Sequence, residues 1–284
     1  MALAVVTTAH DFRRACQEAR IEGELALVPT MGFLHAGHQS LIKAASQRAP
    51  TVAVTIFVNP AQFGPSEDLA RYPRDLAGDL RKCEEAGAQL VFAPAGASEL
   101  YPPGFQTWVE PGQVALPLEG EKRPGHFRGV CTVVLKLFAL SRADAAFFGE
   151  KDYQQLRVIQ RMVQDLNIAT EVIGRPIMRE SDGLALSSRN AYLSSEERER
   201  APALWKALGA VRSAFRSGEH QVARLEDLAR GNLTEGGLRP DYAEVRDPMD
   251  LQRPERADRD SRLFLAAILG KTRLIDNGVV GEAG

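Results

Sequence analysis

Cysteine is scarce in this chain, and its three cysteines, Cys16, Cys83 and Cys131, lie far apart. A sparse and odd set of this kind builds no disulfide framework, and it lacks the paired spacing of a zinc site. We therefore expect free thiols, a reducing compartment and a cytoplasmic protein.

Long apolar runs are also missing, because no stretch approaches the ~20 residues that a membrane-spanning helix needs. Residues 1–6 carry no basic group ahead of their apolar side chains, so we expect no signal peptide. Excess positive charge is missing too, since 35 Lys and Arg oppose 37 Asp and Glu and the net charge is −2. These absences argue against a membrane partner and against a protein that binds nucleic acid mainly through its phosphates.

The chain does contain an ordinary share of core-forming residues, 44% hydrophobic against 25% charged over 284 residues. In its first part, apolar runs typical of buried strands alternate with helical patterns. The predicted strands span residues 24–30, 51–58, 89–93, 145–149 and 170–177. The predicted helices span residues 40–48, 76–86, 129–141 and 153–166. This alternation predicts an α/β fold with a doubly wound parallel sheet and helices on both faces.

Two further regions complete the predicted layout. Residues 94–128 are rich in Pro and Gly, and we expect an excursion over the carboxyl edge of the sheet. After residue 182, a capping pattern at Ser194 and Glu197 opens an amphipathic helix that runs to residue 216. A second helix and three strands are predicted at residues 221–230, 241–246, 263–269 and 272–276. We therefore predict a parallel-sheet domain at residues 1–182 and a small α+β domain at residues 183–284.

The segment between the first predicted strand and its helix carries two histidines, His35 and His38, with Gly32 and Gly37 beside them. The histidines could simply be solvated, or they could bind zinc, although no HExxH or CxxC pattern nearby supplies the further ligands that zinc needs. Alternatively they bind phosphate, because helix N-termini attract anions and glycines let a ligand approach the backbone. The position favours phosphate, since open α/β sheets bind nucleotides at the carboxyl ends of their strands.

Three more polar segments follow predicted strands. Asn59 and Gln62 could form a plain Asn-Pro turn or donate neutral hydrogen bonds to a ligand. Residues 149–155 could be a charged loop that caps a helix, or a site where Lys151 meets phosphate and Asp152 meets ribose. Residues 179–190 could be a polar linker or a polyphosphate clamp. We favour the ligand-binding interpretations, because strands of one parallel sheet bring all these segments to one edge.

Taken together, these motifs resemble the pantoate–beta-alanine ligase family of the nucleotidylyltransferase superfamily, whose signature is a two-histidine loop on a Rossmann-like sheet. The resemblance rests on residues 29–38, 57–63, 72–74, 125–130, 147–155 and 182–190, which occur in the family's order. It implies a reaction in two halves. ATP and pantoate form pantoyl adenylate and pyrophosphate, and beta-alanine then attacks the adenylate to give pantothenate and AMP. Mg²⁺ accompanies the ATP, no prosthetic group is tightly bound, and members form homodimers.

The resemblance also implies roles for residues. His38 and His35 would stabilise the transition state at the α-phosphate, and Lys151 would act with them. Gln62 and Gln155 would bind pantoate, with Gln62 also near beta-alanine. The implied ATP-binding residues are Met31, Gly32, Phe33, Leu34, His35, Ala36, Gly37, His38, Gly149, Glu150, Lys151, Asp152, Met178, Leu186, Ser187, Ser188 and Arg189.

Two departures from the family pattern stand out. Leu186 stands where many family members have Met, and a backbone contact remains possible there. Gly78 stands where some members have the first of two adjacent acids, so only Asp79 remains. We therefore assign no protein ligand to Mg²⁺. His126 and Arg128 receive no role either. The alternatives are another nucleotidylyltransferase with the same loop, and a nucleotide- or RNA-binding module without catalysis, which the net charge disfavours.

Overall fold

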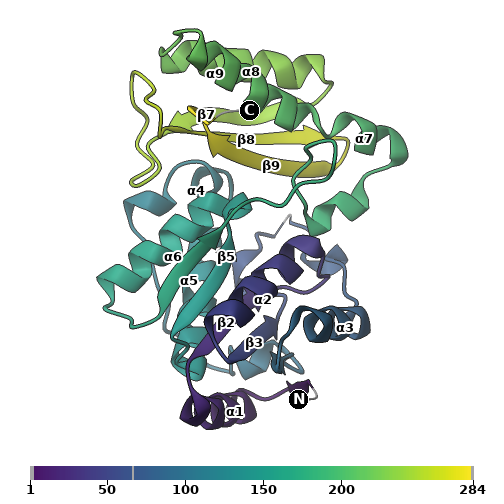
Figure 1. The fold of residues 1–284 in the computed structure, drawn as a ribbon, viewed down its shortest axis with the longest axis vertical. Coiled ribbons are helices and arrows are strands. Elements are labelled where there is room, and N and C mark those ends of the chain that lie inside the picture. The colour runs from purple at the N-terminus through teal and green to yellow at the C-terminus, as the bar shows by residue number, and fades with distance from the viewer. Residues whose placement is uncertain (1–2, 66, 283–284) are drawn as a thin grey trace. The chain divides into compact units, whose positions relative to one another are not determined.

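The computed structural model describes residues 3–65 and 67–282; Met1 and Ala2, part of the stretch considered as a signal peptide, lie outside these residues. The chain divides into two compact units (Figure 1). The first comprises Met1–Glu150 and Gln154–Pro176, and the second comprises Lys151–Tyr153 and Ile177–Gly284. Within the described part of the chain, no helix combines the length and the apolar character needed to cross a membrane.

The first unit is built on a six-stranded sheet in the order β1-β4-β3-β2-β5-β6, and all its paired strands are parallel. The strands are β1 (Ala4–Val6), β2 (Leu25–Thr30), β3 (Thr51–Ile56), β4 (Leu90–Phe92), β5 (Ala145–Gly149) and β6 (Glu171–Arg175). This arrangement confirms the predicted doubly wound parallel sheet. From β2 the chain proceeds outward through β3 to β4, whereas β5 and β6 extend the sheet on the other side. The order therefore reverses between β2 and β5, which is where such sheets bind ligands.

Helices cover both faces of this sheet (Figure 1). They are α1 (Ala9–Glu22), α2 (Ala36–Arg48), α3 (Leu76–Ala86), α4 (Glu119–Lys122), α5 (His126–Ser141) and α6 (Tyr153–Asp165). On one face, Ala26 and Val28 of β2 join Ile42 of α2 and Cys83 of α3 in one apolar cluster. Alternate strand residues point to opposite faces of a sheet. Accordingly α1 and α5 pack against each other and contact β2, with Phe12 of α1 stacked on Phe92 of β4 at 4.6 Å between ring centroids.

The Pro- and Gly-rich excursion contains short turns of 3₁₀-helix, η3 (Ala97–Glu99) and η4 (Gln113–Ala115), before α4. The buried side chain of Gln154, at the start of α6, fastens this excursion beside the end of β5. Its amide nitrogen donates to Val114 O (3.1 Å) and Pro117 O (2.7 Å), and its oxygen accepts from Glu119 N (3.0 Å).

The second unit has an antiparallel sheet in the order β7-β8-β9, with helices packed against it. Its elements are α7 (Ser195–Arg200), α8 (Ala203–Arg216), α9 (Val222–Glu235), β7 (Arg239–Arg246), β8 (Arg262–Leu269) and β9 (Thr272–Val279). Leu204, Leu208, Leu225, Leu263 and Leu265 belong to its separate apolar core. The predicted small α+β fold is thereby confirmed.

Some element bounds differ from prediction for identifiable reasons. The strand β1 and helix α1 were not predicted, because β1 has only three residues and α1 buries only Phe12 and Cys16. The single predicted helix to residue 216 is split between α7 and α8 at Pro202, which has no N–H to donate. Finally, α2 begins at Ala36 rather than at residue 40, so the second histidine lies within its first turn.

Candidate active site

The polar segments of the first unit follow three neighbouring strands. β2 pairs with β3 on one side and with β5 on the other. The two-histidine segment follows β2, Asn59 and Gln62 follow β3, and Gly149 ends β5. Because the carboxyl ends of parallel strands share one edge, these segments meet at the point where the strand order reverses.

The turn after β2 is tightly built. The Thr30 hydroxyl donates to Thr55 O (2.7 Å) and accepts from Gly32 N (3.2 Å). Gly32 and Phe33 both have left-handed backbones, with φ of +85° and +51°. A Cβ at Gly32 would lie 3.0 Å from Asp79 Oδ2 and from Ile56 Cγ2, so glycine suits both the space and the conformation.

The two histidines cap the helix that follows. His35 is the N-cap of α2, and its Nδ1 accepts from Gly37 N (3.2 Å), while His38 Nδ1 accepts from His35 N (3.3 Å). A neutral imidazole that accepts at Nδ1 carries its proton on Nε2. Their ring centroids lie 4.1 Å apart. The capping therefore sets two Nε2–H donors beside the positive end of a helix, an arrangement suited to an anion.

The segment after β3 forms the short 3₁₀-helix η1 (Pro60–Gln62), capped by the Asn59 side chain. Asn59 Nδ2 donates to Gln62 Oε1 (3.0 Å) and to Gly129 O (3.1 Å) of α5. Gln62 Nε2 in turn contacts Met31 Sδ at 3.3 Å. Gly129 permits this close approach, because a Cβ there would lie 2.2 Å from Ala61 O. Gln62 is thus held beside the segment that leads to the histidines.

His126, to which the sequence alone assigned no role, supports the backbone of Gln62. Its Nδ1 donates to Gln62 O (2.9 Å), so its Nε2 accepts from Arg123 Nη1 (3.1 Å). Arg123 is held in turn by Glu67, whose two oxygens accept at 2.9 and 2.7 Å. Burial, together with the neighbouring Arg123 charge, lowers the pKa of His126 to about 4. His126 is therefore a neutral structural group.

The segment after β5 runs through the 3₁₀-helix η5 (Glu150–Asp152) into α6. Gly149 and Gln155 are half-buried, and no described atom outside its chain neighbours lies within 4 Å of where a Gly149 Cβ would stand. A ligand can therefore approach the backbone here. Lys151 and Asp152 belong to the second unit, where Lys151 Nζ lies 3.6 Å from Asp152 Oδ1.

Strand β9 of the second unit anchors the remaining predicted residues through adjacent side chains. Asp276 accepts from both terminal nitrogens of Arg179 (2.7 and 2.9 Å), whose guanidinium stacks 4.2 Å from the Trp205 ring centroid. Asn277 Nδ2 donates to the carbonyl of Lys151 (2.8 Å). One strand therefore holds both the Lys151 segment and the start of the predicted polyphosphate clamp.

The clamp itself is a narrow loop followed by the 3₁₀-helix η6 (Ser188–Tyr192). Leu186 N donates to Met178 O (2.9 Å), which joins the two positions predicted to flank adenine. Ser187 caps η6 by accepting from Arg189 N (3.3 Å), and Ser188 is buried. The predicted residues of this unit thus lie in one continuous, well-supported segment plus Lys151 and Asp152.

No cluster of three or more His, Cys, Asp or Glu side chains that could hold a metal ion occurs among the described residues. Asp79, the remaining acid of the family pair, is engaged otherwise: its oxygens accept from Phe33 N (2.8 Å) and Leu34 N (2.6 Å). A Cβ at Gly78 would lie 2.0 Å from the Asp75 carboxylate that caps α3. These contacts fit a role for Asp79 in supporting the backbone at Phe33 and Leu34 better than a role as a ligand of Mg²⁺.

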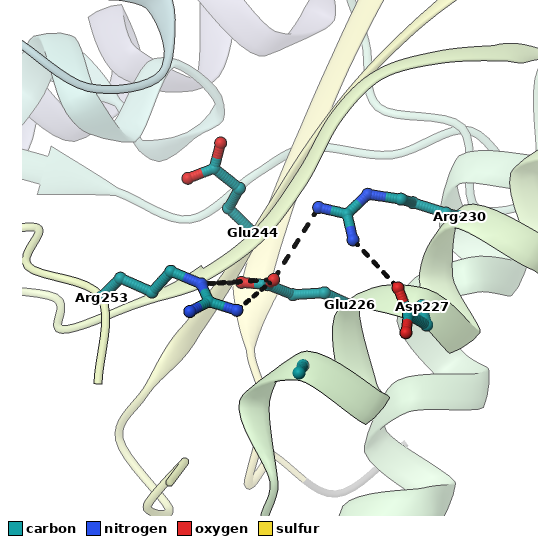
Figure 2. A pocket seen from close by; sticks show the side chains of 6 residues that line it. Glu226, Asp227, Arg230, Glu244 and Arg253 are labelled. Carbon is teal, nitrogen blue, oxygen red and sulfur yellow. Dashed lines mark hydrogen bonds and ion pairs between the residues drawn. The ribbon is translucent and has the colours of Figure 1, made fainter. Parts of the chain in front are cut away.

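A pocket of about 400 Å³ lies on the second unit between α9, β7 and the Arg253 loop (Figure 2). Figure 2 shows Arg253 and Arg230 turned toward Glu226 and Asp227, with Glu226 accepting from Arg253 (2.8 Å) and Arg230 pairing with Asp227 (3.2 Å). The fifth charged side chain, Glu244, points away from this group and pairs with Arg246. Glu226 also accepts from the backbone of Val245. These ion pairs satisfy one another, so the pocket indicates no ligand.

Sequence reasoning missed several supporting residues. Asp79 is the one acid left where some family members have two adjacent acids, which is a weak indication of a role. Arg179 begins the predicted polyphosphate clamp, but the sequence does not indicate its partner, Asp276. Gln154, Asp276 and Asn277 were not singled out, because the segments that they hold, at Glu119, Arg179 and Lys151, lie 35, 97 and 126 residues away. Such contacts become visible only in the folded chain.

Comparison with known proteins agrees with this geometry. The family model described as pantoate-beta-alanine ligase matches residues 4–279. Pantothenate synthetase of Myxococcus xanthus (strain DK1622) is 53% identical over 287 residues, covering 99% of this chain and 97% of the relative. The Geobacter sulfurreducens pantothenate synthetase is 52% identical, covering 98% and 99%.

Solved structures give the same result. The pantothenate synthetase from Thermus thermophilus superposes with a TM-score of 0.92 at 45% identity, covering 98% of this chain and 99% of that one. Pantoate-beta-alanine ligase from Francisella tularensis, complexed with beta-gamma ATP and beta-alanine, gives a TM-score of 0.83 at 33% identity, covering 99% of both chains. Agreement over nearly the whole length, in sequence and in fold, means that the chain belongs to the pantoate–beta-alanine ligase family.

Proposed function

We propose that the protein joins pantoate to beta-alanine at the expense of ATP, through an enzyme-bound pantoyl adenylate. A pantoate carboxylate oxygen attacks the α-phosphorus, and pyrophosphate leaves. The beta-alanine amine then attacks the acyl carbon, an amide bond forms, and AMP leaves. The observation that carries the proposal is the two-histidine cap of α2 at the switch point of the sheet. Family membership supports it further.

The reaction needs positioned donors more than it needs a protein nucleophile. Charge grows on the phosphate oxygens as the carboxylate attacks, and preorganised donors stabilise that charge. We assign this role to Nε2–H of His38 and His35, whose Nδ1 atoms are occupied by backbone amides. Lys151 adds a positive charge toward the leaving pyrophosphate. These three are the proposed catalytic residues.

The other proposed ATP contacts come from several segments of the chain. The backbone of residues 31–37 would line the phosphates, and Gly149, Glu150 and Asp152 would hold the ribose side. Ser187, Ser188 and Arg189 would hold the triphosphate, which suits the planar guanidinium and the hydroxyl donors. Met178 and Leu186, joined by a backbone hydrogen bond, would flank the adenine.

Pantoate binding falls to Gln62 and Gln155. A neutral amide can donate to a hydroxyl or carboxylate without neutralising the nucleophile. Gln62 is 9% exposed and held by Asn59, so its amide is preorganised, and beta-alanine would enter beside it. Gln155 is half-buried one position after the fastened Gln154.

Mg²⁺ would accompany ATP and supply charge neutralisation on the triphosphate. The described residues offer no carboxylate cluster for it, so we propose that the phosphates, not the protein, carry the ion. No tightly bound prosthetic group enters the proposed reaction.

A homodimer and a cytoplasmic location complete the proposal. The homodimer is expected from the family, and the first unit exposes apolar surface that could serve it: Trp108 is 38% and Leu116 66% exposed. The cytoplasmic location is supported by the three cysteines, which are buried and form no disulfide. Sedimentation analysis and cell fractionation test the two statements.

The decisive assay is AMP release that depends on both pantoate and beta-alanine. The two half-reactions separate further, because pantoate alone should support exchange between ATP and labelled pyrophosphate. Exchange driven equally well by another carboxylic acid would favour a different nucleotidylyltransferase. ATP binding without AMP formation would favour a module that binds nucleotide without catalysis.

A further inference from the structure

No substrate contact falls to Asp79, although it is one of the most buried charged residues of the chain, at 1% exposure. It lies in the first turn of α3, and the segment it contacts lies 45 residues earlier. Its two oxygens accept from the consecutive amides of Phe33 and Leu34, at 2.8 and 2.6 Å. A carboxylate with both oxygens so engaged acts as a clamp on the backbone.

We infer that Asp79 is a positioning residue that holds the turn at residues 32–34 so that His35 and His38 present their Nε2–H groups to the α-phosphate. The inference rests on the phosphate role proposed for the two histidines. Its physical basis is the backbone of that turn. Phe33 has a φ of +51°, a conformation that non-glycine residues adopt only when their surroundings impose it.

A second residue of α3, Lys82, holds the same turn. Lys82, one turn further along α3, donates from Nζ to Leu34 O at 2.7 Å. Leu34 is therefore fixed through both its N–H and its C=O, and the next residue is the N-cap His35. Displacement of the turn would shift the histidine cap with it, and small displacements of catalytic donors are costly.

The surroundings of Asp79 act on the pKa of its carboxyl group in both directions. Burial raises the pKa of the carboxyl group, and the Asp75 carboxylate adds to that rise; the amides of Leu34 and Phe33 and the Lys82 ammonium oppose it. The ionised form is the one that can accept from two amides at once. This geometry leaves Asp79 turned toward the backbone, whereas a metal ligand would turn an oxygen toward the phosphates.

Asp79→Asn tests the inference, because it keeps the side-chain size but replaces one acceptor by a donor that faces an amide. The control is Glu84→Gln, which removes one negative charge from an exposed position of the same helix. We expect kcat for pantoate-dependent pyrophosphate exchange to fall ~10²-fold in Asp79→Asn, the cost of a misplaced catalytic group. The half-saturating Mg²⁺ concentration and the KM for pantoate should stay unchanged.

NMR of histidine-labelled protein supplies a readout that lost stability alone would not move. In the unaltered protein His35 and His38 should report neutral rings with the proton on Nε2, and in Asp79→Asn both should shift toward mixed tautomers. Unchanged exchange in a folded variant would overturn the inference. So would an exchange rate that recovers at high Mg²⁺, because that result would make Asp79 a metal ligand.

Two further variants keep the test decisive. If Asp79→Asn does not fold, Asp79→Ser, which retains one acceptor in less volume, is measured in the same way with the same criteria. His38→Ala is measured alongside. Normal exchange in His38→Ala would refute the proposed histidine role itself, whereas a loss in His38→Ala with normal exchange in the Asp79 variants would refute only the positioning role.

Discussion

At the scale of single residues, hydrogen bonds decide which nitrogen of each histidine carries the proton. His35 and His38 accept backbone amides at Nδ1 and therefore donate from Nε2. His126 shows the reverse arrangement, because its Nδ1 donates to a carbonyl and its Nε2 accepts from a guanidinium. One residue type thus forms two helix-capping groups, whose Nε2–H groups we propose as donors to phosphate, and one buried support, and only local geometry distinguishes them.

Removing one anion donor should slow the chemistry without unfolding the protein. For His38→Ala we expect pantoate-dependent pyrophosphate exchange to fall roughly 10²–10³-fold, the usual loss for one transition-state donor. Steady-state exchange and a thermal melt measure the two effects. His10→Ala, at an exposed position of α1, is the control and should exchange normally. Near-normal exchange in His38→Ala would exclude the assigned role.

Gln62→Ala should raise the KM for pantoate more than the KM for ATP. The reason is that the Gln62 amide, which Asn59 holds at the end of β3, is proposed to contact pantoate, whereas the helix cap is proposed to bind phosphate. Initial rates with each substrate varied in turn separate the two constants. Gln164→Ala, on the exposed face of α6, serves as the matched control. An equal rise in both constants would count against direct contact with pantoate.

His126 should make the folded state sensitive to acid. Its folded pKa of about 4 lies below the unfolded value of about 6.5, so the unfolded chain binds more protons between these values. The stability it contributes is therefore present above pH 6.5 and is lost as the pH falls toward 4. The full effect is about 3 kcal/mol, from 1.36 kcal/mol for each pKa unit.

The measurement compares His126→Gln with the unaltered protein by urea unfolding from about pH 7 to about pH 4, the interval that spans the folded and unfolded pKa values. Glu67, Glu119 and Arg123 lie near position 126 in both proteins, so subtracting the two curves removes much of their common contribution. The unaltered protein should lose more free energy of unfolding across this range. Parallel curves would mean that His126 is not held neutral in the folded state.

At the scale of elements, strand β9 acts as a platform that anchors two segments of the second unit, the one at Lys151 and the one that begins at Arg179. Asp276 and Asn277 are adjacent, and adjacent strand residues point to opposite faces. Asp276 therefore contacts Arg179, which stacks on Trp205 of α8. Asn277 contacts the Lys151 carbonyl from the opposite face. Arg262 of β8 completes this second face by stacking 3.8 Å from the Tyr153 ring centroid.

Asn277→Ala should loosen Lys151 and raise the KM for ATP. The substitution removes the hydrogen bond to Lys151 O and also the one that Asn277 Oδ1 accepts from Arg262. Because the loss of the bond to Lys151 costs about 1 kcal/mol, we expect a change of roughly fivefold, with little change in the KM for pantoate. Initial rates with ATP varied measure it. Asn232→Ala removes a comparable bond on α9, from Asn232 Nδ2 to Leu228 O, and should leave the KM for ATP unaltered. An unchanged KM for ATP in Asn277→Ala would refute the platform role.

At the scale of the whole molecule, sequence patterns predicted what is local and missed what depends on distant contacts. The strands β2, β3 and β5 are continuous apolar runs, so the sheet and its shared edge followed from the pattern. The helix cap by His35 did not, because histidine is not among the usual capping residues. Asp79 and Asn277 act on segments 45 and 126 residues away, which no local pattern reports.

The boundary between the two units gives the last prediction. Sequence placed it after residue 182, whereas the second unit includes Ile177 onward, and Arg179 there pairs with the buried carboxylate of Asp276. Each unit has its own apolar core, so a fragment that begins at Ile177 should fold alone. A fragment that begins at residue 183 leaves Asp276 without the guanidinium that donates to both its oxygens, and breaking a buried ion pair costs about 3 kcal/mol.

Urea unfolding followed by circular dichroism compares the two fragments directly. The longer one should unfold cooperatively and be more stable by about 3 kcal/mol. The longer fragment with Arg179→Met separates the ion pair from the extra residues and should behave like the shorter one. Equal stability of all three would show that the ion pair contributes nothing to this unit and that the boundary after residue 182 is sufficient.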